Sequence, residues 1–525
     1  MHPLVLKGGR VVDGSGAPAF DADAAIDGAA IAAIGPGLAG RETIDCSGHV
    51  VAPGFIDTHS HSDLKVLADP TLPMKLRQGI TLEVFGQDGI SVAPVRAGER
   101  EAWRQKLSGL LGDFGALWTW SAVGEYLARV AAARPAQDAA YLAPHGAIRQ
   151  HVMGGGDRRA TPAETRAMQG SLQAALDEGA CGMSTGLIYP PCCYADTAEL
   201  VALGTVLAPA NRPLVVHMRS ESDRMMEAIA EMVGVARQSG CAVHISHLKL
   251  AGRRNWGNAE AVVEALAAAR AQGLRITADQ YPYAAGSTLL GAILPPWAHD
   301  GGSEATLARL RDTDARARMR AAMSDPGPSD WDNFWGWSGP EGILVADIPS
   351  GRHPEWLGRT LAQVAAGRGQ DPFEAAFDLL LEERMGVAMV SFSQDENVVE
   401  RFLRLPYVNV CTDGLLGGRP HPRAYGSYPR ILGRYVREKR TLTLEEAVRK
   451  MTSQAASAFG FEGVGLVREG FRANLVVFDP ATVTDRATFE NPLQFPVGVR
   501  DVIVGGTPAV RDGAVTGVRS GKIVK

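Results

Sequence analysis

Cysteine, net charge and long apolar runs are all scarce in this sequence. Six cysteines in 525 residues are too few for a disulfide framework, so we expect a reduced, cytoplasmic protein. No apolar run reaches the ~20 residues of a membrane-spanning helix, and the N-terminal stretch MHPLVLKGGRVVDG lacks the basic and apolar segments of a signal peptide. The formal net charge of −5 gives no reason to expect nucleic acid or an anionic membrane as a partner. We expect a globular protein, and the sequence carries no signal for its oligomeric state.

Both ends of the chain consist of short β-like runs separated by glycine-rich turns. At the start these runs are VLKGGRVVDG, ADAAIDGAAIAAIG and TIDCSGHVVAPG, and near the end they are ANLVVFDP and VRDVIVGGTPAVRDGAV. Chain ends often lie close together in a domain. The sequence therefore predicts one small β-sandwich domain built from residues 1–52 and 460–525.

The middle of the chain, residues 53–459, alternates short apolar runs with helical patterns. Such alternation is typical of βαβ units and a parallel sheet, so we expect an α/β fold with a TIM-like (β/α)8 barrel. Helices are expected at 162–178, 225–239, 259–272, 372–384 and 443–458. Nine candidate strands compete for eight barrel positions, so one must belong elsewhere; they are 54–58, 80–85, 140–144, 180–184, 213–217, 242–247, 274–279, 387–392 and 408–412.

The alternation breaks at about residues 290–343. This stretch carries proline, glycine, four tryptophans and a basic helical run over 307–322. A long irregular segment inside a compact domain is usually functional. We therefore interpret it as an insertion or lid.

The motif PGFIDTHSHSD places two histidines, His59 and His61, at the end of an apolar strand. Side chains two residues apart in a strand point to the same side, so two imidazoles and the in-phase Asp57 converge there. Imidazole is a good ligand for first-row metals. A histidine pair of this spacing is by itself usually a polar strand end, so its significance depends on residues farther along.

Further histidines end the next clear strands. His217 closes LVVHMRSESD, and His244 and His247 lie in AVHISHLKLAG. In a barrel, groups at the carboxyl ends of strands face one shared site. His247 lies at the strand end and is the better ligand, whereas His244 lies deeper and is expected to be structural. Asp413 ends a strand in NVCTDG; each residue alone could be a turn or cap residue, but the whole set predicts a metal centre.

This order of residues resembles the amidohydrolase superfamily, and within it the N-acyl-D-amino-acid deacylases, or D-aminoacylases. The resemblance extends over most of residues 50–460 and includes long strings beyond the candidate metal ligands. These strings are GACGMSTGLIYPP, HMRSESDR, ISHLKLAG, NWGNA, DQYPYAAGST and HPRAYGSYPRILGRYVRE. The resemblance implies a (β/α)8 barrel flanked by a β-sandwich, and a metal-dependent hydrolase.

The resemblance also implies roles for single residues. His217 and His247 match the ligands of a tightly held zinc, His59 and His61 match those of a second, weaker metal position, and Asp413 matches the catalytic acid and base. Zn2+ is the implied cofactor, as one or two ions, with Mn2+ or Co2+ as other divalent choices. Residues at positions that hold the substrate and its free carboxylate are Lys249, Tyr189, Tyr281, Ser287 and Arg423.

One position departs from the family pattern. Where D-aminoacylases carry a metal-binding cysteine in a GNCGIS-like motif, this chain reads VFGQDGIS, with Asp88 at that place. A carboxylate is a competent zinc ligand and is harder than a thiolate, which would favour Mn, Co or a dinuclear centre. The superfamily's other bridging group, a carboxylated lysine, is excluded because CGMSTGL has no lysine. Alternatives remain: Asp88 as a turn residue before Gly89, or Glu83 as the ligand.

Three other residues are weaker candidates for the functional site. Cys192 and Cys193 are adjacent, a spacing that disfavours a disulfide between them, and we expect loop thiols near the pocket. His145 ends a possible strand and belongs either to the pocket wall or to the core.

The predicted function is hydrolysis of a linear amide, from an N-acyl-D-amino acid to a D-amino acid and a carboxylate. Water activated by the metal would attack the amide, with Asp413 as general base and then acid. One alternative is another amidohydrolase reaction, on a cyclic amide as in hydantoinases and dihydroorotases, or on a xenobiotic or natural-product amide. A second alternative is an inactive scaffold, which the complete set of ligands and Asp413 disfavours.

Overall fold

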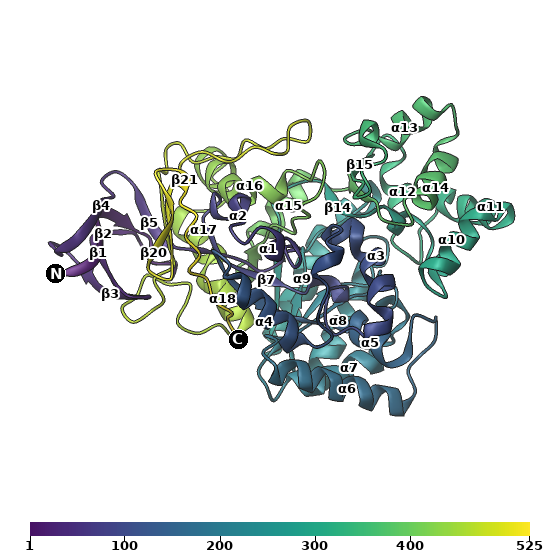
Figure 1. Cartoon of the computed structure of the whole chain (residues 1–525), viewed down its shortest axis with the longest axis horizontal. Coiled ribbons are helices and arrows are strands. Elements are labelled where there is room, and N and C mark those ends of the chain that lie inside the picture. Colours follow the sequence, from purple (N-terminus) through teal and green to yellow (C-terminus); the bar gives the residue numbers. More distant parts are fainter.

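The computed structural model describes residues 1–525, with the side chain of Ala116 left aside. The molecule has three parts that follow one another along its longest axis (Figure 1). A β-sheet built from both chain ends lies at one end, a helical segment around residues 286–391 lies at the other, and an α/β barrel lies between them. The predicted fold class is confirmed.

Eight parallel strand positions form the barrel. The sheet order is β17-β13-β12-β11-β10-β9, and a second run is β6-β7-β8; β8 and β9 are one strand position interrupted at Leu142. The ends of β6 and β17 close the ring through a parallel bridge between Ser60 and Gly414. The strands are β6 (Phe55–Asp57), β7 (Ile80–Phe85), β8 (Asp138–Tyr141), β9 (Ala143–Pro144), β10 (Met183–Gly186), β11 (Pro213–His217), β12 (Ala242–Ile245), β13 (Ile276–Gln280) and β17 (Val408–Val410).

The ninth strand candidate, 387–392, belongs to another sheet. It forms β16 (Ala388–Ser391), which lies antiparallel between β14 (Gly286–Leu289) and β15 (Ile343–Asp347). The residues of β16 are all buried, so its apolar run looks the same as that of a barrel strand. Pairing partners, which are not encoded locally, decide which sheet it joins.

The three-stranded sheet carries its own helices and its own hydrophobic cluster. The expected insertion, 290–343, lies within this longer part of the chain, as does the helix expected at 372–384; its function as a lid stays a prediction. The helices are α10 (Ser303–Arg311), α11 (Thr313–Ser324), α12 (Phe334–Ser338), α13 (Leu361–Arg368) and α14 (Pro372–Glu382).

The helices that cover the barrel follow their sequence signals closely. In α6, Thr161 caps the first turn, Glu164 completes the capping box and Pro162 occupies the first position. Met168 and Leu172 on its inner face are fully buried, and each contributes roughly 1.5–3 kcal/mol of burial free energy. The helix expected at 443–458 is instead two helices, because Thr452 has φ −136° and ψ −93°.

The other helices around the barrel have these bounds: α1 (Lys65–Ala68), α2 (Pro73–Leu76), α3 (Arg100–Leu111), α4 (Val123–Ala133), α5 (His145–Met153), α6 (Pro162–Asp177), α7 (Thr197–Leu207), α8 (Met225–Ser239), α9 (Ala259–Ala271), α15 (Glu396–Leu403), α16 (Arg423–Arg430), α17 (Leu444–Met451) and α18 (Ser453–Phe459). A π-helical segment, Ile431–Glu438, continues α16. No helix in the described chain combines the length and the apolar character required to traverse a lipid bilayer.

The terminal sheet joins the two ends of the chain directly. β5 pairs antiparallel with β18, with Pro53 opposite Leu475 and Val50 opposite Phe478. β1 pairs with β4 along its first half and with β5 along its second, so the sheet curves around a shared core. Its strands are β1 (His2–Val11), β2 (Phe20–Asp27), β3 (Ala30–Gly35), β4 (Gly40–Asp45), β5 (Val50–Pro53), β18 (Leu475–Phe478), β19 (Val499–Val504), β20 (Thr507–Arg511) and β21 (Ala514–Val515).

A buried ion pair ties this sheet to the barrel. Asp138, at the start of β8, accepts two hydrogen bonds from the Arg472 guanidinium at 2.6 and 2.7 Å. Asn474 donates a third bond at 2.8 Å and the backbone of Lys522 a fourth. Because every acceptor position of the carboxylate is used, the buried charge is fully compensated.

Gly86, directly after β7, lies where the barrel leaves no space for a side chain. Its φ is +81°, and an added Cβ would lie 2.2 Å from the Leu142 carbonyl oxygen. Gly28 also has a positive φ, +56°, but no atom lies within 4 Å of its Cβ position. We expect Gly86→Ala to lower the free energy of unfolding by about 1–3 kcal/mol more than Gly28→Ala, because overpacking adds to backbone strain. Chemical denaturation of both variants measures the difference; equal losses would contradict it.

Candidate metal centre

Six of the predicted site residues meet at the carboxyl ends of the barrel strands. His59 and His61 follow β6, Asp88 follows β7, His217 ends β11, His247 follows β12 and Asp413 follows β17. They form two groups whose ligand atoms lie within 4.8 Å of one another, and Asp88 belongs to both. The groups are His59, His61, Asp88 and Asp413, and Asp88, His217 and His247.

In the first group, two imidazoles face two carboxylates. The Nε2 atoms of His59 and His61 each lie 3.6 Å from Asp88 Oδ2. They lie 3.5 and 3.2 Å from Asp413 Oδ1. The four atoms therefore surround a space of the size that a divalent cation occupies between its ligands.

In the second group, the other oxygen of Asp88 faces the second histidine pair. Asp88 Oδ1 lies 3.9 Å from His217 Nδ1 and 3.6 Å from His247 Nε2. The two ring nitrogens lie 3.0 Å apart. Asp88 thus presents one oxygen to each histidine pair, the arrangement of a carboxylate that bridges two metal ions.

Unsatisfied polar atoms support a metal at this place. Within the described part of the chain, His59 Nε2 and Asp88 Oδ1 are buried without a hydrogen-bond partner, which is costly unless another group satisfies them. Burial lowers the pKa of His217 to about 4, so its ring is neutral and able to bind a metal. Burial opposes ionisation of Asp88, but His59 and His247 outweigh it and hold the pKa of this carboxyl well below its ordinary value. Imidazole and carboxylate donors in this number fit zinc or a similar divalent ion.

Glu83, the rival candidate ligand, has other partners. Its Oε2 accepts hydrogen bonds from Ser60 and Ser62 at 2.6 and 2.8 Å and lies 3.1 Å from Lys75 Nζ. Asp57 likewise pairs with Lys75, at 2.7 Å. The geometry therefore favours Asp88, while Glu83 and Asp57 support the strand that carries His59 and His61.

Three of the clustered residues have backbones in the left-handed region. The φ values are +57° at Asp88, +35° at His247 and +48° at Asp413. Residues with a Cβ rarely adopt this conformation, and each instance costs roughly 1–3 kcal/mol. Such strain is characteristic of residues aimed at a functional site.

Glu221 is a site residue that the sequence analysis missed. Its Oε1 lies 3.0 Å from His247 Nδ1 and 2.6 Å from Lys249 Nζ, and its Oε2 lies 3.4 Å from His217 Nε2. Carboxylates behind metal-binding histidines fix the orientation and basicity of the rings. Burial opposes the Glu221 charge, but His217 and Lys249 keep the pKa of this carboxyl below its ordinary value. Its position four residues after His217 was the available signal.

The five predicted substrate residues line the same small pocket as the candidate ligands. Lys249 pairs with Glu221, and the Arg423 guanidinium lies 2.8 Å from Asp413 Oδ2 and 4.4 Å from the centre of the Tyr281 ring. Burial opposes ionisation of Asp413, but Arg423 and His59 hold its pKa far below the ordinary value. Arg423 therefore contacts the proposed catalytic carboxylate itself, which the sequence did not indicate.

Hydrogen bonds fix the remaining three side chains. Tyr189 and Thr288 share a bond of 2.7 Å between their hydroxyls. Ser287 donates to the Met389 carbonyl at 2.7 Å, and Tyr281 accepts a bond of 2.8 Å from Gln394. Thr288 and Ser287 lie on β14 and Met389 on β16, so the three-stranded sheet of β14, β16 and β15 forms one wall of the pocket.

The lesser candidates lie outside the two ligand groups. His244 bonds Thr277 and Asp279 at 2.8 and 3.1 Å, in keeping with the expected structural role. Burial disfavours a charged ring at His145, but Cys192 and Glu199 outweigh it and raise its pKa to about 9. Its ring bonds Glu199 at 2.8 Å. All six cysteines are free thiols.

Comparison with known proteins agrees with this geometry. The model of the amidohydrolase family matches residues 42–510. The chain is 37% identical to an N-acyl-D-glutamate deacylase of Alcaligenes xylosoxydans xylosoxydans over 99% of this chain and 96% of that protein. It is 34% identical to a D-aminoacylase of the same organism over 99% of this chain and 97% of that protein.

A similar solved structure is that of N-acyl-D-glutamate deacylase from Bordetella bronchiseptica. It is a complex with zinc and a phosphonate inhibitor that mimics the tetrahedral intermediate of the reaction. The two chains are 35% identical, the TM-score is 0.84, and the match covers 100% of this chain and 99% of the other.

Replacing Glu221 tests its orienting role. We expect Glu221→Gln to weaken metal binding by about 10–100-fold, because the rings of His217 and His247 lose a charged partner. Glu231→Gln is the matched control, since Glu231 pairs with Arg219 at 3.0 Å and contacts no candidate ligand. Competition with a chromophoric chelator measures both affinities; an unchanged affinity in Glu221→Gln would exclude this role.

Proposed function

The chain belongs to the amidohydrolase family, and from this we propose that it is a metal-dependent hydrolase of linear amides, acting on N-acyl-D-amino acids. The products would be a D-amino acid and a carboxylate. Full-length identity of 34–37% to the deacylases supports the reaction class. The single observation that carries the proposal is the Asp88 carboxylate shared by two histidine pairs opposite Asp413.

Two metal positions follow from this arrangement. His217 and His247 with Asp88 would hold one divalent ion, and His59 and His61 with Asp88 would hold the second. Zinc is the proposed ion, since the related Bordetella deacylase is a zinc complex; the harder Asp88 ligand also suits Mn2+ or Co2+. When bound, such an ion brings the pKa of water near 7 and polarises a carbonyl group.

Asp413 would move the proton. Its Oδ2 is held by Arg423, and its Oδ1 lies 3.2 Å from His61 Nε2. Once the His61 ring binds a metal ion, Oδ1 would be able to accept a proton from the attacking water. The water oxygen forms a bond to the amide carbon, the C–N bond then breaks, and Asp413 returns the proton to the departing amine. One carboxylate thus serves as base and then as acid, so no serine or cysteine nucleophile is required.

Lys249 and the hydroxyl of Tyr281 would bind the substrate carboxylate. Ser287 would line the same pocket, with its hydroxyl proton donated to the Met389 carbonyl. Lys249 is paired with Glu221, but an ammonium group has three donors and can serve a second anion. Arg423, which like Lys249 lies against the ring of Tyr281, adds a second positive charge to the pocket while it orients Asp413. Fixing the carboxylate would determine which face of the Cα carries the amide, and therefore the preference for the D-enantiomer.

The alternatives keep the metals and change the substrate. A cyclic amide needs no clamp for a free carboxylate, so Lys249 and Arg423 favour the linear substrate. A xenobiotic or natural-product amide would use the same chemistry. An inactive scaffold is disfavoured by the complete set of candidate ligands.

We further propose a cytoplasmic location, which the six free cysteines support. The proposed domain limits are residues 1–52 with 460–525 for the sheet domain and 53–459 for the barrel, with the insertion at about 290–343 acting as a lid.

A substrate panel tests the proposed function. We expect the zinc-loaded protein to hydrolyse N-acetyl-D-amino acids at least 100-fold faster than their L-enantiomers, and cyclic imides more slowly still. Release of the free amine, with metal content measured on the same samples, provides the readout. Rapid opening of hydantoin or dihydroorotate, or a protein that retains no metal, would refute the proposal.

The role of Asp413 has a separate test. We expect Asp413→Asn to lower kcat by about 10²–10⁴-fold, because an amide cannot accept the proton. Metal should remain bound at His217 and His247. Asp395→Asn, at the half-buried N-cap of α15, is the control for a charge change elsewhere, because asparagine also caps helices well. Wild-type kcat in Asp413→Asn would show that another group moves the proton.

A further inference from the structure

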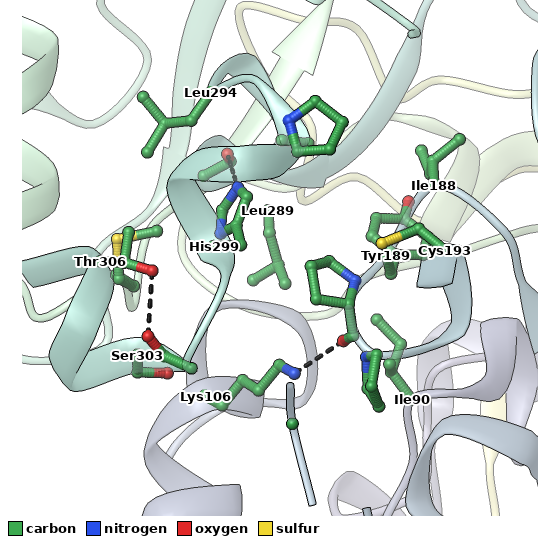
Figure 2. Close-up of a pocket in the computed structure, with 18 of the residues that line it drawn as sticks. Ile90, Lys106, Ile188, Tyr189, Cys193, Leu289, Leu294, His299, Ser303 and Thr306 are labelled. Carbon is green, nitrogen blue, oxygen red and sulfur yellow. Dashed lines mark hydrogen bonds between the residues drawn. The ribbon is translucent and has the colours of Figure 1, made fainter. Parts of the chain in front are cut away.

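A large cavity lies between the barrel and the insertion, beside the candidate metal centre. Its volume is about 570 Å³, within the range of ligand pockets. The segment after β10, from Leu187 to Cys193, forms one side, and α3 contributes Trp103 and Lys106. The end of β14 contributes Leu289, and the insertion contributes Leu294 and His299. Figure 2 shows Lys106 and His299 facing the space between these walls. The lining is mainly apolar.

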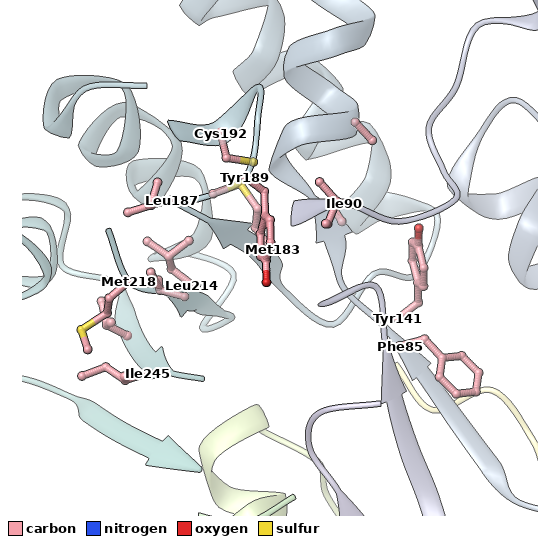
Figure 3. Packing of buried hydrophobic residues seen from close by; sticks show 14 of the residues in the cluster. Phe85, Ile90, Tyr141, Met183, Leu187, Tyr189, Cys192, Leu214, Met218 and Ile245 are labelled. Carbon is pink, nitrogen blue, oxygen red and sulfur yellow. The ribbon is translucent and has the colours of Figure 1, made fainter. Parts of the chain in front are cut away.

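Two side chains connect this cavity to the metal centre. Tyr189 and Phe334 line both spaces, and the Tyr189 ring centre lies 5.1 Å from that of His217. Figure 3 shows Tyr189 within a packed cluster that includes Leu187, Met183 and Cys192. Because this wall belongs to the barrel core, it is fixed rather than adaptable.

The cavity is too large for a small acyl group. A methyl-sized group or a water occupies about 30 Å³, so an acetyl group would leave most of the 570 Å³ unfilled. An apolar space that stays empty loses dispersion contacts along its whole lining. The space therefore suits an extended apolar chain.

Lys106 gives the cavity one cation without an anionic partner. Its ammonium group donates a hydrogen bond to the Pro190 carbonyl at 2.7 Å and lies 4.8 Å from the Trp103 ring centre. Burial lowers its pKa to about 8, so it is mostly charged at pH 7. No carboxylate of the described residues lies within 4.0 Å of it.

The carboxylates that also line the cavity are largely engaged elsewhere. Asp157 and Asp330 line the cavity as exposed side chains, Glu304 pairs with Arg384, and Glu99 lies 3.7 Å from Arg96. Asp332 accepts bonds from Ser220, Ser222 and the Glu221 backbone. The two free donors of Lys106 are therefore available to an anion that enters along the apolar walls.

We propose that this cavity is the subsite for the acyl arm of the substrate, and that it selects acyl groups with an apolar chain of several carbons ending in a carboxylate that pairs with Lys106. The assignment rests on the proposed deacylase function. With the amino-acid carboxylate at Lys249 and Tyr281, the acyl arm is assigned to the cavity because Tyr189 and Phe334 line both the small pocket and the cavity.

Three matched substrates test the assignment: N-acetyl-, N-hexanoyl- and N-adipoyl-D-alanine. Adipoyl differs from hexanoyl only in its terminal carboxylate. We expect kcat/KM to rise about 10-fold or more from acetyl to hexanoyl, through burial of the added methylenes, and about 10-fold again from hexanoyl to adipoyl. N-acetyl-D-phenylalanine and N-acetyl-D-leucine test the amino-acid side chain as the rival occupant.

Two variants separate the charge from the space. Lys106→Met should reduce the ratio of kcat/KM for the adipoyl substrate to kcat/KM for the hexanoyl substrate to about 1 or below. Because both values are measured on the same variant, a general loss of activity cancels in this ratio. Ala292→Trp, which adds a ring to the cavity lining, should reduce the hexanoyl-to-acetyl ratio. Lys7→Met, on the exposed face of β1, should change neither ratio.

A binding measurement separates the subsite from catalysis. Calorimetry with adipic acid monoamide and hexanamide on the zinc-loaded protein should give about 10-fold tighter binding of the monoamide, and Lys106→Met should remove this difference. Equal binding, equal rates for acetyl and hexanoyl, or a gain that follows the amino-acid side chain would overturn the assignment. If one of these outcomes occurs but N-acetyl-D-alanine is hydrolysed, the acyl subsite is wrong and the deacylase function still holds. If the monoamide binds more tightly but no substrate is hydrolysed, the subsite holds and the deacylase function is wrong.

Discussion

The position of one carboxylate, that of Asp88, constrains the whole candidate site. Its two oxygens face two different histidine pairs, so a displacement in either direction would separate the site into unconnected halves. The loop that carries it begins at Gly86, whose φ of +81° and close approach to Leu142 leave no space for a side chain. Glycine is therefore required at position 86 for the chain to place Asp88 between the two histidine pairs.

Buried charges around this carboxylate are arranged in compensated groups. Glu221 lies between two candidate ligands and Lys249, Asp413 lies against Arg423, and Asp57 shares Lys75 with Glu83. An isolated buried charge would be strongly unfavourable, but a fully hydrogen-bonded group of opposite charges is tolerated and fixes side-chain orientation. The apolar packing of the barrel behind these groups offsets the unfavourable free energy of burying their charges. The result is a rigid set of donors in a region from which water is largely excluded.

The barrel and the insertion contribute different things to the pocket. The ends of the barrel strands and the loops after them provide the candidate ligands, Asp413, Lys249 and Tyr281, and the sheet of β14, β15 and β16 provides Ser287 and the contact to Tyr189. The insertion also closes one side of the cavity beside the centre. All of the candidate ligands therefore lie on the barrel, whereas the walls of the neighbouring pocket and cavity come from both parts of the chain.

Local sequence signals were sufficient for the barrel and for most of the candidate ligands. His59, His61, His217, His247 and Asp413 were identified because alternation along a strand and position at its end are short-range properties. The fold class and the family followed from the same motifs. Glu221, the pairing of Arg423 with Asp413, and the sheet that β16 joins were not accessible in this way. Each depends on contacts between segments that are far apart in the chain or on a side chain in a loop, and neither hydrophobic periodicity nor motif spacing encodes such contacts. Folding brings these groups together, because closing the barrel places every strand end around one point.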